Sequence, residues 1–110
     1  MIKRLTIILS TILLTLQAED LGKYITSGTY KITEPNEIFT LITNDEGYIS
    51  IDGFNLFVCT GTLRNKKGKI VGSSGLINKI EIPVKANQTY YLYINKRKMQ
   101  YDCTINIFIP

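Results

Sequence analysis

Few residues in this chain of 110 could carry out catalytic chemistry. The chain contains no histidine, which removes the commonest general base and the commonest imidazole ligand for metals. The best remaining candidates are two neighbouring carboxylates, Asp45 and Glu46, but side chains in a turn of this kind normally point to solvent. A calcium site needs six or more converging oxygens, and no loop has that spacing. We therefore expect no enzymatic activity, no metal site and no cofactor.

Two cysteines, Cys59 and Cys103, are the other reactive side chains. In a secreted protein they would pair by default, and closing a loop of about 45 residues would stabilise the chain by on the order of 4 kcal/mol. The pattern around Cys59 leaves its direction open. If Phe54 and Val58 face the core, Cys59 faces outward and meets Cys103 poorly. A bulge, or an inward face made by Phe57 and Cys59, would remove the conflict.

Two basic clusters are candidates for binding an acidic protein surface or a polyanionic glycan. One spans residues 64–69, RNKKGK, and the other is Lys96, Arg97 and Lys98. In a simple up-and-down chain these clusters lie at opposite ends of the domain, although a crossover would change that. The ordinary alternative is that both are solvated loop tips.

A run of tyrosines precedes the second basic cluster. In a strand, Tyr91 and Tyr93 share one face, while Tyr90, Leu92 and Ile94 share the other and make the better core face. Outward tyrosine rings suit recognition, although they also simply cover sheet surfaces. We predict that the binding residues are Tyr91, Tyr93, Lys96, Arg97 and Lys98.

A glycosylation sequon, Asn87-Gln88-Thr89, falls in a predicted turn. In a eukaryotic source we expect Asn87 to be glycosylated, whereas in a bacterial source the tripeptide has no such meaning.

The first residues have the pattern of a secretory signal peptide. Lys3 and Arg4 precede an apolar run at residues 5–16, which is too short to span a bilayer, and Ala18 offers a small residue at the cleavage point. An uncleaved membrane anchor is the alternative. We expect a signal peptide at residues 1–18 and one secreted domain at residues 19–110, outside the cell or in the lumen of the secretory-lysosomal pathway.

Alternation of apolar and polar residues, rather than a helical period, marks the rest of the chain. It predicts eight short strands separated by turn residues, which favours a small antiparallel β-sandwich. Residues 37–44 and 47–51 look like a hairpin, and so do the last two strands. In the last strand we expect Tyr101, Cys103, Ile105, Ile107 and Ile109 to face the core. The predicted strands are 28–33, 37–44, 47–51, 54–60, a short one around 70–71, 79–85, 89–95 and 101–109.

The C-terminal half resembles the bacterial pre-peptidase C-terminal domain. The order of motifs is NLFV at residues 55–58, KIEIPV at 79–84, ANQTYYLYI at 86–94 and YDCTI at 101–105. Asn55 and Gln88 depart from the aspartate and the glycine of that family. The resemblance implies a small secreted sandwich that binds peptidases, other proteins or glycans without catalysis.

A second resemblance is to chagasin-like inhibitors of papain-type cysteine peptidases, which act through three loops. Residues 44–48, 72–75 and 97–99 occur in the same order as those loops, although the first and third lack the family's proline. We expect a secreted, non-catalytic binding module for a protein, such as a peptidase, or for a glycan. An inhibitor of papain-type peptidases and a surface or structural antigen are the alternatives.

Overall fold

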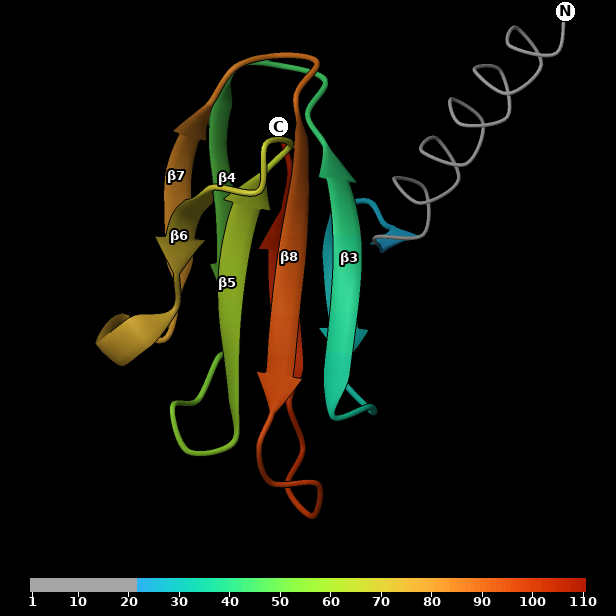
Figure 1. Ribbon diagram of the computed structural model, residues 1–110, viewed down its shortest axis with the longest axis vertical. Coiled ribbons are helices and arrows are strands. Elements are labelled where there is room, and N and C mark those ends of the chain that lie inside the picture. Colours follow the sequence, from blue (N-terminus) through green and yellow to red (C-terminus); the bar gives the residue numbers. More distant parts are fainter. Residues whose placement is uncertain (1–21) are drawn as a thin grey trace, which may run out of the picture.

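The computed structural model describes residues 22–110, which form two β-sheets packed face to face (Figure 1). The five-stranded sheet has the order β1-β3-β8-β5-β6, and the four-stranded sheet has the order β2-β9-β4-β7. All pairs are antiparallel except β1 with β3. The elements are β1 (Lys23–Tyr24), β2 (Gly28–Lys31), β3 (Asn36–Ile42), β4 (Gly47–Asp52), β5 (Cys59–Asn65), β6 (Ile70–Ser73), the 3-10 turn η1 (Gly75–Ile77), β7 (Ile80–Val84), β8 (Thr89–Lys96) and β9 (Thr104–Phe108).

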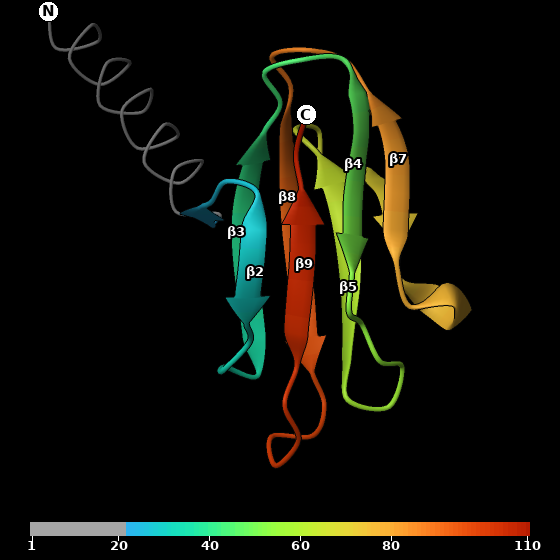
Figure 2. The ribbon, with the colours of Figure 1, turned by 180° about the vertical axis from the view of Figure 1, so that it is seen from behind.

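The chain changes sheet at almost every connection. Strands β3 and β4 are consecutive but lie in different sheets, and so do β8 and β9 (Figure 2). Among the described strands, β5 and β6 make the one hairpin of sequence neighbours. The predicted antiparallel sandwich is therefore confirmed, but both predicted hairpins are wrong. Alternation fixes which side chains face inward, and this pattern is the same whether a strand pairs with its neighbour or packs against it.

The core lies between the sheets and is built by alternate residues of each strand. Leu92 and Ile94 of β8 face Ile105 and Ile107 of β9 across it, as predicted, and Ile109 packs against the same cluster partly buried. Tyr101 was predicted in this set but is 55% exposed, because β9 begins only at Thr104. The core residues are Ile25, Ile32, Phe39, Leu41, Ile49, Ile51, Phe54, Cys59, Leu63, Ile80, Val84, Tyr90, Leu92, Ile94, Cys103, Ile105 and Ile107.

The segment predicted as a strand at residues 54–60 is mostly a tight turn. The N–H of Cys59 donates to the carbonyl of Asn55 at 2.7 Å, and the N–H of Asn55 donates back to the carbonyl of Cys59 at 3.1 Å. Phe54 enters the core before this turn, and its ring occupies the space above Gly61, where a Cβ would lie 2.4 Å from the ring. Strand β5 then starts at Cys59 and carries Cys59, Gly61 and Leu63 on the core side.

This turn settles the direction of Cys59. Both Cys59 and Cys103 are buried, and they form a disulfide with Cα atoms 6.3 Å apart. Cys59 faces inward without a bulge in a continuous strand and without an inward Phe57. The chain instead reverses between Phe54 and Cys59, so that both of these residues reach the core. The bond joins the five-stranded sheet, through β5, to the residue that precedes β9 in the four-stranded sheet.

The predicted signal peptide lies outside the described residues. Within residues 22–110 the structure contains no helix with the length and apolar character needed to cross a membrane. The predicted division at residues 18 and 19 stays a prediction.

Replacing both cysteines with alanine tests how much the sandwich depends on its disulfide. Since the bond closes a loop with a sequence separation of 44, we expect C59A/C103A to lower the free energy of unfolding by about 2–4 kcal/mol. Urea unfolding at pH 7, followed by circular dichroism, measures the difference. An unchanged unfolding midpoint would show that the two sheets hold together without the bond.

Candidate functional site

Three connections meet at one end of the sandwich, the lower end in Figures 1 and 2. They join β2 to β3, β4 to β5 and β8 to β9. The last two are tied directly, because the N–H of Arg97 donates to the carbonyl of Val58 at 2.7 Å and the disulfide lies beside them. We call five exposed residues of these two connections the loop end; they are Phe57, Arg97, Lys98, Met99 and Tyr101.

Phe57 stands at the tip of the turn between β4 and β5. Its side chain is 73% exposed, and its N–H donates to Oδ1 of Asn55 at 2.9 Å. That bond, together with the two backbone bonds between Asn55 and Cys59, fixes the turn from within. The aromatic ring is thus displayed on a rigid support, which reduces the entropy lost when a partner binds.

The connection between β8 and β9 displays two further large side chains. Met99 is 47% exposed and Tyr101 is 55% exposed, and the N–H of Tyr101 donates to the carbonyl of Lys98 at 3.2 Å to close a turn. Arg97 and Lys98 are exposed on the same connection. Aromatic residues, methionine and arginine are the residue types enriched where proteins bind one another. The loop end therefore has the composition of a protein-binding surface.

Lys96, predicted as a binding residue, is buried and serves the fold. Its side chain is 7% exposed, and its Nζ donates to the carbonyl of Ile32 at 3.1 Å. Its backbone N–H donates to the carbonyl of Pro35 at 2.8 Å. Both bonds hold the connection between β2 and β3 against the end of β8. Of the predicted basic triplet, Arg97 and Lys98 remain available at the surface.

The two predicted tyrosines lie on the outer face of the five-stranded sheet, at its central strand. Tyr91 stands between Thr40 of β3 and Arg64 of β5 and is only 8% exposed. Tyr93 is half-buried, and the guanidinium of Arg64 lies 5.5 Å from the centre of its ring. This arrangement is a cation–π contact, which stabilises the sheet surface itself. The two tyrosines therefore offer less free surface than their alternation alone indicates.

The two basic clusters lie at opposite ends of the molecule. The tip of the β5–β6 hairpin, which contains Lys66 and Lys67, is at the end away from the β8–β9 connection (Figure 1). The β7–β8 turn shares that far end, and there Asn87 is exposed with a left-handed φ of 58°. Its glycosylation stays a prediction that depends on the source.

The sequence missed Phe57 because it was assigned to a strand, and Tyr101 because it was assigned to the core face of one. Met99 was placed in a loop, but it was not singled out as a binding residue. A signal for the turn was present in Asn55, since asparagine side chains bind the backbone N–H two residues on and stop a strand. Within residues 22–110, no group of three or more histidine, cysteine or carboxylate side chains is placed to hold a metal ion.

Solved structures of other small proteins and domains share this fold. No protein-family model matches the chain, and no curated protein matches it either. The pre-peptidase C-terminal domain of a collagenase from Bacillus anthracis is similar, with a TM-score of 0.54 and 20% identity over 79% of this chain and 92% of that one. The weak resemblance that the sequence indicated is thereby confirmed at the level of fold.

A bacterial inhibitor has a similar fold. PliG, a periplasmic inhibitor of g-type lysozyme, superposes with a TM-score of 0.54 for the protein of Aeromonas hydrophila, at 8% identity over 74% of this chain and 86% of that one. The PliG of Salmonella Typhimurium gives 0.51, at 11% identity over 81% and 99%. At these identities the likeness concerns the fold alone.

The segments that resemble the chagasin loops do not form one surface. Residues 44–46 lie between β3 and β4, while residues 97–99 follow the other end of β8. Strand β8 has eight residues, which at about 3.3 Å each span roughly 26 Å. The two segments therefore lie at opposite ends of the sandwich rather than side by side.

Replacing Lys96 with methionine separates a structural lysine from a binding one. We expect K96M to lower the free energy of unfolding by about 1–2 kcal/mol, because the carbonyl of Ile32 loses its donor. The control is R97Q/K98Q, which changes exposed cations and should shift stability by less than about 0.5 kcal/mol. Thermal unfolding of both variants measures the contrast, and equal stability of the two would contradict the structural role.

Proposed function

We propose that the chain is a small, secreted, non-catalytic module that binds a protein through its loop end. The observation that carries the proposal is the display of Phe57, Met99 and Tyr101 on two connections locked together by backbone hydrogen bonds and the Cys59–Cys103 disulfide. Exposed aromatic and sulfur-containing side chains on rigid backbone are the typical anchors of a binding interface.

Arg97 and Lys98 extend this surface with positive charge. Exposed charges at the edge of an interface mainly speed association and select partners. In the same connection the carboxylate of Asp102 is paired with Nζ of Lys31 at 3.6 Å. Within the described residues, Arg97 and Lys98 are therefore the exposed charges of this connection that have no salt-bridge partner. We infer a partner whose contact site combines an apolar pocket for Phe57 with acidic groups around it.

Secretion is part of the same proposal. Disulfides form and persist outside the reducing cytosol, and the pair here is buried in the core. The similar folds belong to a domain of a collagenase and to a periplasmic lysozyme inhibitor, so a secreted hydrolase is the partner class that we propose first. Inhibition of such an enzyme is one form that the binding would take.

A photo-crosslinking residue at position 57 identifies the partner. The modified protein is added to the secreted fraction of the source organism and irradiated, and the adducts are analysed by mass spectrometry. The control carries the same residue at position 108, on the outer face of the four-stranded sheet, where Phe108 is 57% exposed. We expect a defined adduct from position 57 that position 108 does not give.

The affinity of the purified partner then tests the anchor. We expect F57S to weaken binding at least tenfold, because interface anchors contribute about 2 kcal/mol or more, while F108S leaves it within twofold. Biolayer interferometry measures both constants. If the two variants bind alike, or if position 57 gives no specific adduct, the surface or structural role is the better account of the chain.

A further inference from the structure

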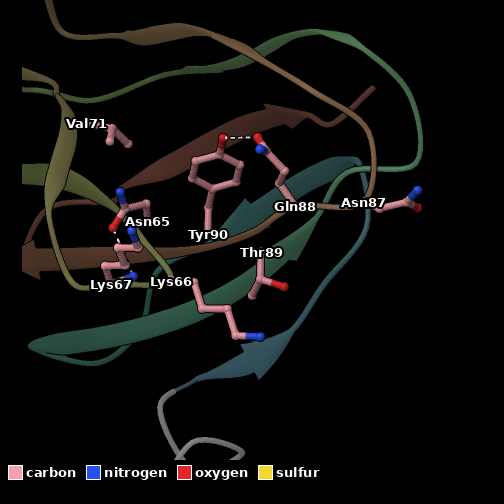
Figure 3. Close-up of a pocket in the computed structure, with 8 residues that line it drawn as sticks. All are labelled: Asn65, Lys66, Lys67, Val71, Asn87, Gln88, Thr89 and Tyr90. Carbon is pink, nitrogen blue, oxygen red and sulfur yellow. Dashed lines mark hydrogen bonds between the residues drawn. The ribbon is translucent and has the colours of Figure 1, made fainter.

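A cavity lies at the end of the sandwich opposite to the loop end. It has a volume of about 400 Å³, which is within the roughly 300–1,000 Å³ range of small-molecule sites. The tip of the β5–β6 hairpin forms one side, and the β7–β8 turn with the start of β8 forms the other (Figure 3). The lining residues are Asn65, Lys66, Lys67, Val71, Asn87, Gln88, Thr89 and Tyr90.

The hairpin side of the cavity is fixed by Asn65. Its Oδ1 accepts hydrogen bonds from the N–H groups of Lys67 and Lys69, both at 3.0 Å. Gly68 takes a left-handed φ of 85° in this turn, and its carbonyl accepts a bond from Nη1 of Arg64 at 2.8 Å. The backbone that carries Lys66 and Lys67 is thus held in place before any ligand binds.

The turn on the other side is clamped by a buried threonine. The N–H of Gln88 donates to Oγ1 of Thr43 at 2.9 Å, and the N–H of Asn87 donates to the carbonyl of Thr43 at 2.8 Å. Oγ1 of Thr43 in turn donates to the carbonyl of Lys85 at 2.6 Å. This network fixes the turn that carries Asn87 and Gln88. In Figure 3 the amide of Gln88 meets the hydroxyl of Tyr90, and the side chain of Asn87 points away from the other lining residues.

The hydrogen bonds inside the cavity wall engage the amide oxygens of Gln88 and Asn65 and leave their NH₂ groups as donors. Oε1 of Gln88 accepts the hydroxyl of Tyr90 at 2.7 Å and the N–H of Lys85 at 3.2 Å. Burial raises the pKa of Tyr90, so its hydroxyl stays protonated and keeps donating to Gln88. With their amide oxygens engaged, Gln88 and Asn65 have their NH₂ groups left to donate to a ligand.

The charges of the cavity have one sign. Lys66 and Lys67 are the charged residues among those that line it, and no carboxylate is among them. The positive charge of Lys66 and Lys67 and the two amide donors favour a negatively charged group, while Thr89 and the apolar Val71 suit a polyhydroxylated ring beside it. We propose that this cavity binds a sugar that carries a carboxylate or a sulfate, and that it is a second site independent of the loop end.

Titration with small acidic sugars tests the proposal. The ¹⁵N-labelled protein is produced in bacteria, so that Asn87 carries no glycan, and is titrated with glucuronic acid and with glucose 6-sulfate. Glucose serves as the neutral probe, and acetate and sulfate as the free anions. We expect saturable shifts confined to the amides of residues 65–69 and 87–90. The response to the two acids shows whether a carboxylate or a sulfate is preferred.

Charge-matched variants assign the binding to the cavity. We expect K66Q/K67Q to lower the affinity for the acidic sugar at least tenfold, whereas R97Q/K98Q, at the other end of the molecule, should change that affinity less than twofold. Q88E keeps the acceptor for Tyr90 and Lys85 but replaces the free NH₂ donor with a negative charge, so it should also weaken binding. Its control is Q100E, on the β8–β9 connection.

Several results would overturn the sugar site. These are equal shifts with glucose, binding of acetate or sulfate alone as tight as that of the acidic sugar, or shifts outside the two segments. Equal loss of affinity in K66Q/K67Q and R97Q/K98Q would show that net charge, rather than the cavity, attracts the ligand. None of these results bears on the partner of Phe57, so the two proposals fail separately.

Discussion

The disulfide between Cys59 and Cys103 is the constraint on which the functional end of the molecule depends. It joins the two sheets where the chain turns three times, and it lies directly beneath the two connections that display Phe57, Met99 and Tyr101. Three hydrogen bonds stabilise the connections at the same end. Oδ1 of Asn55 accepts from the N–H of Phe57. Arg97 donates to the carbonyl of Val58, and Lys96 donates to that of Ile32. A chain this small buries a limited apolar core, so a covalent link allows it to expose large apolar side chains that would otherwise favour burial.

The fold class followed from the sequence because strand alternation depends only on which side chains face the core. Leu92, Ile94, Ile105 and Ile107 were placed correctly by that rule alone. The pairing of strands did not follow, because a four-residue connection such as 43–46 can return the chain beside its own strand or carry it across to the other sheet. Both outcomes bury the same residues, and only the packing of the complete sandwich distinguishes them.

Only part of each candidate site could be predicted, because local sequence shows that a loop is exposed but does not show which distant segments pack together. Arg97 and Lys98 are in a loop, and loops are exposed, so composition was sufficient to find them. Lys96 is one residue earlier, at the end of β8, and there the alternation turns it inward to a backbone carbonyl. The cavity near Tyr90 needs the β5–β6 hairpin and the β7–β8 turn side by side, and segments some 20 residues apart give no local signal of such proximity.

The crossing connections also determine how the chain can fold. Only β5 and β6 pair with a neighbour in sequence among the described strands, while β2 finds β9 and β3 finds β8 across most of the domain. Proteins dominated by such distant pairings fold in milliseconds to seconds, because the entropy of closing long loops is lost before the contacts form. Newly made chains therefore keep their strands unpaired for longer than chains built from local hairpins, and the unpaired strand edges expose them to aggregation during that time.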